Sequence, residues 1–206
     1  MNEQESGLFD DYGTYYTISA ATSHPTPVVF LHGVGLDCTM WASQVHGLSP
    51  YFPVLTYDLI GHGRTPHRPD TNSLADYVSQ LIELLDSLDI EVIHLVGFSV
   101  GGIIAQRFCG LAPQRLASVT FMNSVYQRTE NELVQVRARL QVTRTQGALA
   151  TADDALARWF NTSFRESNPK LMERIRTRLV SNDLAGYVAA YRCFVDGDEE
   201  VGDALK

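Results

Sequence analysis

The sequence has few of the features that mark disulfide-rich, secreted or membrane proteins. Its 206 residues include only three cysteines, Cys38, Cys109 and Cys193. They are widely spaced, which predicts reduced, partly buried thiols rather than a disulfide framework or a metal site. Residues 1–6 lack the basic start and apolar core of a signal peptide, and no apolar run is long enough to span a bilayer. We therefore expect a cytoplasmic protein without a membrane partner.

Basic residues are also scarce. The chain has 16 basic and 24 acidic residues, which gives a net charge of −8. This balance argues against nucleic acid or an anionic membrane surface as a partner. A Gly-x-Gly-x-x-Gly fingerprint is missing too, which argues against a nucleotide-binding domain. A hydrophobic content of 45% predicts a globular protein of one domain plus an insertion.

Apolar runs alternate with helical patterns over the first part of the chain. Runs without polar alternation, typical of strands buried on both faces, occupy residues 28–31, 54–57, 92–96 and 118–122. Residues 12–20 favour an edge strand or hairpin. Helical patterns occupy residues 40–48, 73–88 and 101–111. This order predicts an α/β fold with a doubly wound, mainly parallel sheet.

The pattern changes after residue 125. No strand-like run follows, and helices are expected at residues 130–146, 152–160, 169–180, 184–194 and 199–206. We interpret residues 1–125 as an α/β core and residues 126–206 as a helical cap or lid. The alternative is the helical half of an ordinary α+β domain.

The most informative motif is Gly97-Phe98-Ser99-Val100-Gly101, which lies between a predicted strand and a predicted helix. Glycines on both sides of the serine let strand and helix approach closely around a strained turn. Such a turn exposes the hydroxyl of the central residue, where a base can reach it. We interpret Ser99 as a nucleophile for acyl transfer; the alternative is a turn serine.

A second motif, His32-Gly33-Val34-Gly35, directly follows the strand at residues 28–31. A tetrahedral intermediate carries a negative oxygen and needs backbone N–H donors aimed at it. We expect these donors at Val34 and at Val100, the residue after the nucleophile. The glycines beside Val34 allow the loop to expose its amide. We interpret His32 as a structural residue that fixes the loop.

A third motif, at residues 58–65, follows the strand at residues 54–57. The Gly61-His62-Gly63 segment predicts a tight turn. We expect Asp58 to anchor this turn and Arg64 to make internal hydrogen bonds.

Three such motifs in this order, each directly after a strand, resemble the α/β-hydrolase superfamily over residues 12–125. The resemblance implies a mainly parallel sheet, a helical cap after the sixth strand, no metal and no cofactor. The cap segment is similar to that of β-ketoadipate enol-lactone hydrolases and small carboxylesterases. The matching aromatic residues are Trp159, Phe160, Phe164 and Tyr187, with Arg158 and Gly186 beside them. These aromatics suggest a partly apolar substrate pocket, although core packing explains them equally well.

The chain departs from this family in one respect. All six histidines precede Ser99, whereas the family triad runs serine, acid, histidine along the chain. Asn123 and Ser124 occupy an alternative acid position, and neither is a carboxylate. Asp196 and Asp198 are interpreted as solvated charges at a helix end. The sequence therefore predicts a C-terminally truncated hydrolase that is nearly inactive alone.

Two functions remain open. The first is a serine hydrolase, an esterase or lactonase, that cleaves a small carboxylic ester or lactone through an acyl-enzyme, with an incomplete triad. The alternative is a non-catalytic ligand-binding member of the same fold. Without further strands, residues 118–122 would form an exposed sheet edge, which predicts instability or self-association.

Overall fold

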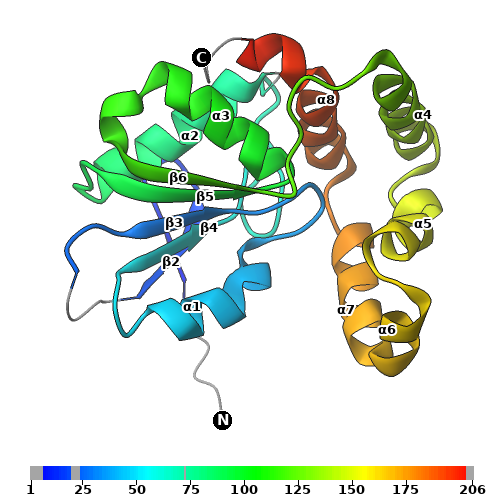
Figure 1. Ribbon diagram of the computed structural model, residues 1–206, viewed down its shortest axis with the longest axis horizontal. Helices are drawn as coiled ribbons and strands as arrows, with labels where there is room; N and C mark the ends of the chain where they lie inside the picture. Colours follow the sequence, from blue (N-terminus) through cyan, green and yellow to red (C-terminus); the bar gives the residue numbers. More distant parts are fainter. Residues whose placement is uncertain (1–6, 20–23, 72, 203–206) are drawn as a thin grey trace.

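The computed structural model describes residues 7–19, 24–71 and 73–202, and it contains a mixed six-stranded sheet (Figure 1). The strands are β1 (Leu8–Phe9), β2 (Tyr15–Ser19), β3 (Val28–Leu31), β4 (Val54–Tyr57), β5 (Ile93–Phe98) and β6 (Leu116–Met122), in the spatial order β1-β2-β4-β3-β5-β6. The pairs β3–β4, β3–β5 and β5–β6 are parallel, whereas β1–β2 and β2–β4 are antiparallel. The predicted doubly wound, mainly parallel sheet is confirmed, and residues 12–19 contribute β2 of a hairpin; Ala20 lies outside the described residues.

Helices cover both faces of the sheet (Figure 1). They are the 3-10 helix η1 (Cys38–Trp41), α1 (Ala42–Leu48), α2 (Leu74–Ser87), α3 (Val100–Leu111) and the 3-10 turn η2 (Pro113–Arg115). The helix expected at residues 40–48 starts two residues earlier, as a 3-10 turn. The reason is that the Asp37 side chain accepts a hydrogen bond from the Thr39 N–H and caps that turn.

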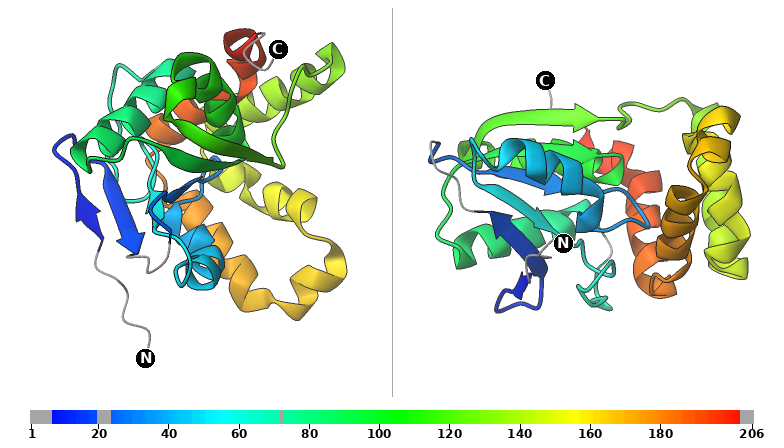
Figure 2. Two further views of the ribbon diagram at one scale, coloured as in Figure 1. Left: turned by 60° about the vertical axis from the view of Figure 1, so that its left-hand side comes forward. Right: turned by 90° about the horizontal axis from the view of Figure 1, so that it is seen from below.

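Residues 130–201 form five helices, which we call the helical segment: α4 (Glu130–Gln146), α5 (Leu149–Trp159), α6 (Thr162–Ser167), α7 (Pro169–Val180) and α8 (Leu184–Val201). It lies beyond the carboxyl ends of β5 and β6 (Figures 1 and 2). The sequence missed the short helix α6. It also predicted two helices where α8 runs on as one to Val201; residues 203–206 lie outside the description. Gly197 lies inside α8, and glycine is favoured there because a Cβ would lie 2.7 Å from Ile103 Cγ2 of α3.

Two hydrophobic clusters meet along α8. The main cluster packs β3, β4 and β5 against α2, α3 and α8, which contributes Ala190, Cys193 and Val201. A smaller cluster joins α5 and α7 to Tyr187 near the start of α8. The prediction that residues 1–125 and 126–206 are separate units stays a prediction, since α8 shares both clusters.

Strand β6 forms one edge of the sheet, because β5 is its only described neighbour. Most of its side chains are exposed, including Phe121 and Met122. Its seven residues, Leu-Ala-Ser-Val-Thr-Phe-Met, carry no charge and no proline. Charged residues and proline usually protect a sheet edge from pairing. The exposed edge expected at residues 118–122 is therefore present.

The interpretation of Asp198 as a solvated charge is wrong. Its carboxylate pairs with Arg128 Nε at 2.7 Å, and the side chains of Arg128 and Asp198 are only 5% and 17% exposed. The N–H of Arg128 also donates to this carboxylate, at 3.2 Å. Asp196 fits the solvated interpretation better, since it is 48% exposed and lies 3.7 Å from Arg192.

Candidate active site

Ser99 occupies a strained turn between β5 and α3. Its backbone has φ 55° and ψ −116°, a conformation that residues with a side chain rarely adopt. The turn is held from β6 and the segment after it. The Ser99 N–H donates to the Met122 carbonyl at 3.0 Å, and the Ser124 hydroxyl donates to the Ser99 carbonyl at 3.0 Å. The hydroxyl-bearing side chain of Ser99 is only partly buried.

The glycines around Ser99 are required by close backbone contacts. A Cβ at Gly97 would collide with the Gly101 carbonyl, and one at Gly101 would lie 2.6 Å from the Leu31 carbonyl of β3. At both positions the neighbouring backbone lies too close for any side chain. The Gly-x-Ser-x-Gly pattern therefore follows from the packing of β5, α3 and β3 around the turn.

The loop after β3 lies directly beside Ser99. A Cβ built at Gly33 would lie 3.4 Å from the Ser99 Cβ and 3.0 Å from the Phe98 ring. The structure thus brings together two motifs that are more than 60 residues apart in the sequence. Any larger residue at position 33 would fill the space next to the serine.

The His32 ring fixes the conformation of this loop through hydrogen bonds. Its Nε2 accepts a hydrogen bond from the Leu59 N–H at 2.9 Å, so its Nδ1 carries the proton and donates to the Gly33 carbonyl at 2.8 Å. The Leu36 N–H donates to the same carbonyl at 3.1 Å. Burial lowers the pKa of His32 and keeps the ring neutral.

These bonds also orient the amide of Val34. In a trans peptide the C=O of one residue and the N–H of the next point in opposite directions. Because the Gly33 carbonyl is held by His32 and Leu36, the Val34 N–H faces the other way. Within the described part of the chain, neither this N–H nor that of Val100, the first residue of α3, donates to a protein acceptor.

The turn after β4 is organised by Asp58, which is almost fully buried. Its carboxylate accepts hydrogen bonds from the backbone N–H groups of Cys38 and Arg64, each at 2.8 Å. The Arg64 side chain donates to the Tyr15 hydroxyl. His62 in the same turn is buried, and burial lowers its pKa to about 3. Its ring stacks on Tyr187 with centroids 6.4 Å apart.

No hydrogen bond joins a histidine ring to Ser99 among the residues that the structure describes, a set that includes all six histidines. The His32 ring is hydrogen-bonded to the backbone as described above, and His62 Nδ1 lies 3.2 Å from the Ile60 carbonyl oxygen. His24 and His94 contact one another, with ring centroids 5.9 Å apart, near the amino ends of β3 and β5. Ser99 follows the carboxyl end of β5, so this pair lies at the opposite end of the sheet.

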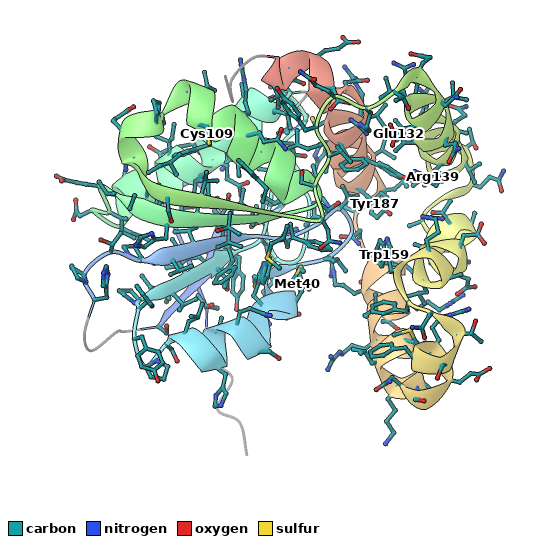
Figure 3. The ribbon with its side chains drawn as sticks, viewed as in Figure 1. Met40, Cys109, Glu132, Arg139, Trp159 and Tyr187 are labelled. Carbon is teal, nitrogen blue, oxygen red and sulfur yellow. The ribbon has the colours of Figure 1, made fainter. Side chains whose placement is uncertain are left out.

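The four aromatic residues of the expected pocket separate into two groups. Tyr187 is buried against the loop after β3, since a Cβ at Gly35 would lie 2.5 Å from its ring. Phe160 and Phe164 stack on each other with centroids 5.3 Å apart, and Trp159 is about half exposed. Figure 3 shows Tyr187 and Trp159 on the side of the helical segment nearest the core. Their role as a substrate pocket stays a prediction.

The structure adds residues that the sequence analysis did not select. Asn182, in the turn between α7 and α8, donates to the Gly35 carbonyl at 2.9 Å. Arg178 pairs with Asp37 just after the same loop, with 3.3 Å between Nε and the carboxylate. These residues carry no local motif, and only their contacts across the fold identify them.

A hollow of 480 Å³ lies within the helical segment, away from Ser99. Its walls come from α5, α6 and α7 and include Leu156, Arg165 and Met172. Among the described residues, no cluster of three or more His, Cys, Asp or Glu side chains is arranged to hold a metal. The same part of the chain has no helix long and apolar enough to cross a bilayer.

Comparison with known proteins agrees with this architecture. Residues 26–186 match the alpha/beta hydrolase fold family. The chain is 31% identical to an (E)-2-((N-methylformamido)methylene)succinate hydrolase and 28% identical to 3-oxoadipate enol-lactonase 2, both from Acinetobacter baylyi. These matches cover 84% and 83% of the chain, but only 64% and 63% of the two relatives. The chain thus spans less than two thirds of their length.

Solved structures give the same result. A hydrolase from Pseudomonas aeruginosa has a TM-score of 0.81 and 26% identity, covering 95% of this chain and 74% of its own. The enol-lactonase from Burkholderia xenovorans has a TM-score of 0.80 and 27% identity, covering 93% and 74%. The chain belongs to the α/β hydrolase fold family, and its relatives include enol-lactonases and other hydrolases.

Proposed function

We propose that this chain carries the nucleophile and the oxyanion donors of a serine hydrolase that acts on a small carboxylic ester or lactone. The observation that carries the proposal is the position of Ser99, in a strained turn directly beside the loop of Val34. Its Oγ attacks the substrate carbonyl carbon, and the developing oxyanion accepts hydrogen bonds from the Val34 and Val100 N–H groups. Collapse of this intermediate expels the alkoxide and leaves an acyl-enzyme, which water hydrolyses.

The activities named for the relatives support the substrate class. An enol-lactonase cleaves the ester bond within a ring. The same attack of a serine hydroxyl on the carbonyl carbon would open a lactone or cleave a small linear ester. The helical segment would then serve as the cap over Ser99, with Tyr187 against the loop. No step in this reaction calls for a metal or an organic cofactor. The three free thiols Cys38, Cys109 and Cys193 support a cytoplasmic location.

The Ser99 proton needs an acceptor during the attack. None of the six histidines is hydrogen-bonded to Ser99 in the described structure, so we expect this proton to pass to solvent. Loss of a triad member lowers the rate by about 10⁴- to 10⁶-fold, while the oxyanion donors retain some catalysis. We therefore expect slow acylation of Ser99 in this chain and acceleration by a base added to the solution.

Labelling with a fluorophosphonate probe tests the proposal. We expect slow covalent labelling that peptide mass spectrometry maps to Ser99 and that added imidazole accelerates. Ser99→Ala should abolish the label, whereas Ser43→Ala, at an exposed serine in α1, should not change it. Labelling that is unchanged in Ser99→Ala would refute the role of this serine.

The absence of a histidine beside Ser99, among the described residues, favours a second candidate: a ligand-binding protein of the same fold without catalysis. It predicts saturable binding of a small lactone that Ser99→Ala leaves unchanged and no probe adduct at Ser99. The labelling experiment separates the two candidates.

We also propose self-association through β6. Its seven uncharged residues leave one row of backbone N–H and C=O groups unpaired in the described structure. Two copies can align these edges antiparallel around a two-fold axis without placing like charges together.

A further inference from the structure

The loop that carries Val34 is held from two sides. His32 and Leu36 bind the Gly33 carbonyl from the α/β core, as described above. On the other side of Val34, the Gly35 carbonyl accepts a hydrogen bond from Asn182 Nδ2 in the helical segment, at 2.9 Å. Asn182 is 147 positions away from Gly35 in the sequence. The two carbonyls that flank Val34 are thus fixed by different parts of the fold.

Arg178 extends this contact on the helical side. Its Nη2 donates to Asn182 Oδ1 at 2.5 Å, which orients the Asn182 amide group so that Nδ2 faces Gly35. Its Nε lies 3.3 Å from the Asp37 carboxylate, with side-chain exposures of 22% and 16%. Asp37 also accepts from the Thr39 N–H at 3.0 Å, so the far end of the loop is fixed to η1.

Packing around Gly35 leaves the loop no room to shift toward the helical segment. Gly35 has φ 77°, which favours glycine, and a Cβ there would lie 2.7 Å from Leu179 and 2.5 Å from Tyr187. The loop therefore makes polar contacts with Asn182 and Arg178, and it packs against the side chains of Leu179 and Tyr187.

We propose that Asn182, oriented by Arg178, is a positioning residue for the Val34 amide. This inference rests on the proposed role of Val34 as an oxyanion donor. An oxyanion donor works only when it is held in place before charge develops, because reorientation during the reaction forfeits its advantage. The Gly35 carbonyl and the Leu36 N–H belong to one planar peptide, so release of this carbonyl lets the peptide rotate and the Leu36 N–H leave the Gly33 carbonyl. The Gly33–Val34 peptide then keeps only the His32 bond, and the Val34 N–H is no longer held in one direction. Asn182 itself does not touch the reacting atoms.

The test compares Asn182→Ala with Ser181→Ala. Asn182 Nδ2 also lies 2.9 Å from the Arg178 carbonyl at the end of α7, and the Ser181 hydroxyl donates to the same carbonyl at 3.2 Å. Ser181 has no described contact with the loop. A loss caused only by fraying of α7 would therefore occur in both variants, whereas a loss caused by release of Gly35 would occur only in Asn182→Ala.

Two measurements are made on each variant of the chain. The first is hydrogen exchange of the Leu36 amide, which reports the loop without any reaction; we expect about tenfold faster exchange in Asn182→Ala only. The second is Ser99-dependent release of p-nitrophenol from p-nitrophenyl acetate with imidazole as base. We expect kcat to fall about tenfold at unchanged KM, since a positioning residue acts on the transition state.

A second variant guards against misfolding of the first. Arg178→Ala should give the same pattern more weakly, whereas Arg174→Ala, one turn earlier on α7, should not. Equal Leu36 exchange in Asn182→Ala and Ser181→Ala would overturn the inference. Faster exchange at an unchanged kcat would overturn it too. If the wild-type chain shows no Ser99-dependent release, the proposed function fails, and so does the assignment of Asn182 to catalysis, even where the exchange result shows that it holds the loop.

Discussion

The Arg128–Asp198 ion pair provides the sharpest prediction of stability. It joins the segment after β6 to α8, and Arg128 Nη2 also donates to the carbonyls of Phe194 and Val195, at 2.6 and 3.0 Å. Removing one partner of a buried pair costs about 3–5 kcal/mol, because the other charge stays buried. Since Asp198→Ala leaves Arg128 these two carbonyl acceptors, we expect about 3 kcal/mol, the lower end of that range. For a chain of this size this lowers Tm by about 6–12 °C.

Urea unfolding at pH 7, followed by tryptophan fluorescence and circular dichroism, measures this loss. Asp196→Ala is the matched control, because Asp196 lies on the same helix but pairs at 3.7 Å with Arg192 in a solvated position. Solvent screening should hold its effect below about 0.5 kcal/mol. Equal effects of the two substitutions, or a loss below about 1 kcal/mol for Asp198→Ala, would refute the reasoning that burial makes this pair important.

Three further predictions follow from the described contacts. Burial lowers the pKa of His62 to about 3, so as the pH falls the unfolded chain binds a proton at this residue at a higher pH than the folded chain does. The contribution of neutral His62 to the free energy of unfolding is therefore complete above about pH 7. It falls by up to about 1.4 kcal/mol per pH unit between about pH 6.5 and pH 3. His62→Gln should flatten urea midpoints measured between pH 7 and pH 5, and an unchanged slope would contradict this. Gly186→Ala should destabilise the fold by at least about 2 kcal/mol, since its Cβ would lie 2.7 Å from the Gly61 carbonyl oxygen, whereas Gly47→Ala, with open space around it in α1, should stabilise by about 0.5–1 kcal/mol in the same assay. Thr120→Lys on β6 should shift the chain from dimer to monomer in multi-angle light scattering, and a wild-type monomer would rule out edge pairing.

The central strands were predictable because their burial leaves a local trace. All side chains of β3 and β4 are buried, and continuous apolar runs reflect this directly. The turn at Ser99 was predictable for a similar reason. Close backbone contacts at Gly97 and Gly101 restrict those positions to glycine, so local packing is visible in the sequence.

The contacts of the helical segment were not predictable in this way. Asn182 binds a carbonyl 147 positions away, and Asp198 pairs with an arginine 70 positions away. A polar residue on a helix or in a turn gives no local signal that distinguishes a distant partner from solvent. The short helix α6 was missed because its six residues carry no amphipathic repeat, and only the Asn161 cap marks its start.

Helix α8 has a mechanical consequence. Gly197 packs against α3 and Tyr187 packs against Gly35, so α8 connects the two hydrophobic clusters. The helix acts as a rigid rod with its pivot at Gly197. The step of ten residues from Tyr187 to Gly197 spans about 15 Å at the usual helical rise. A tilt of only about 5° at the pivot would displace the phenol by about 1.3 Å, as the geometry of a rod of that length requires. A small change in packing beside Ile103 would therefore displace Tyr187 at the other end of this span, where it contacts the loop after β3.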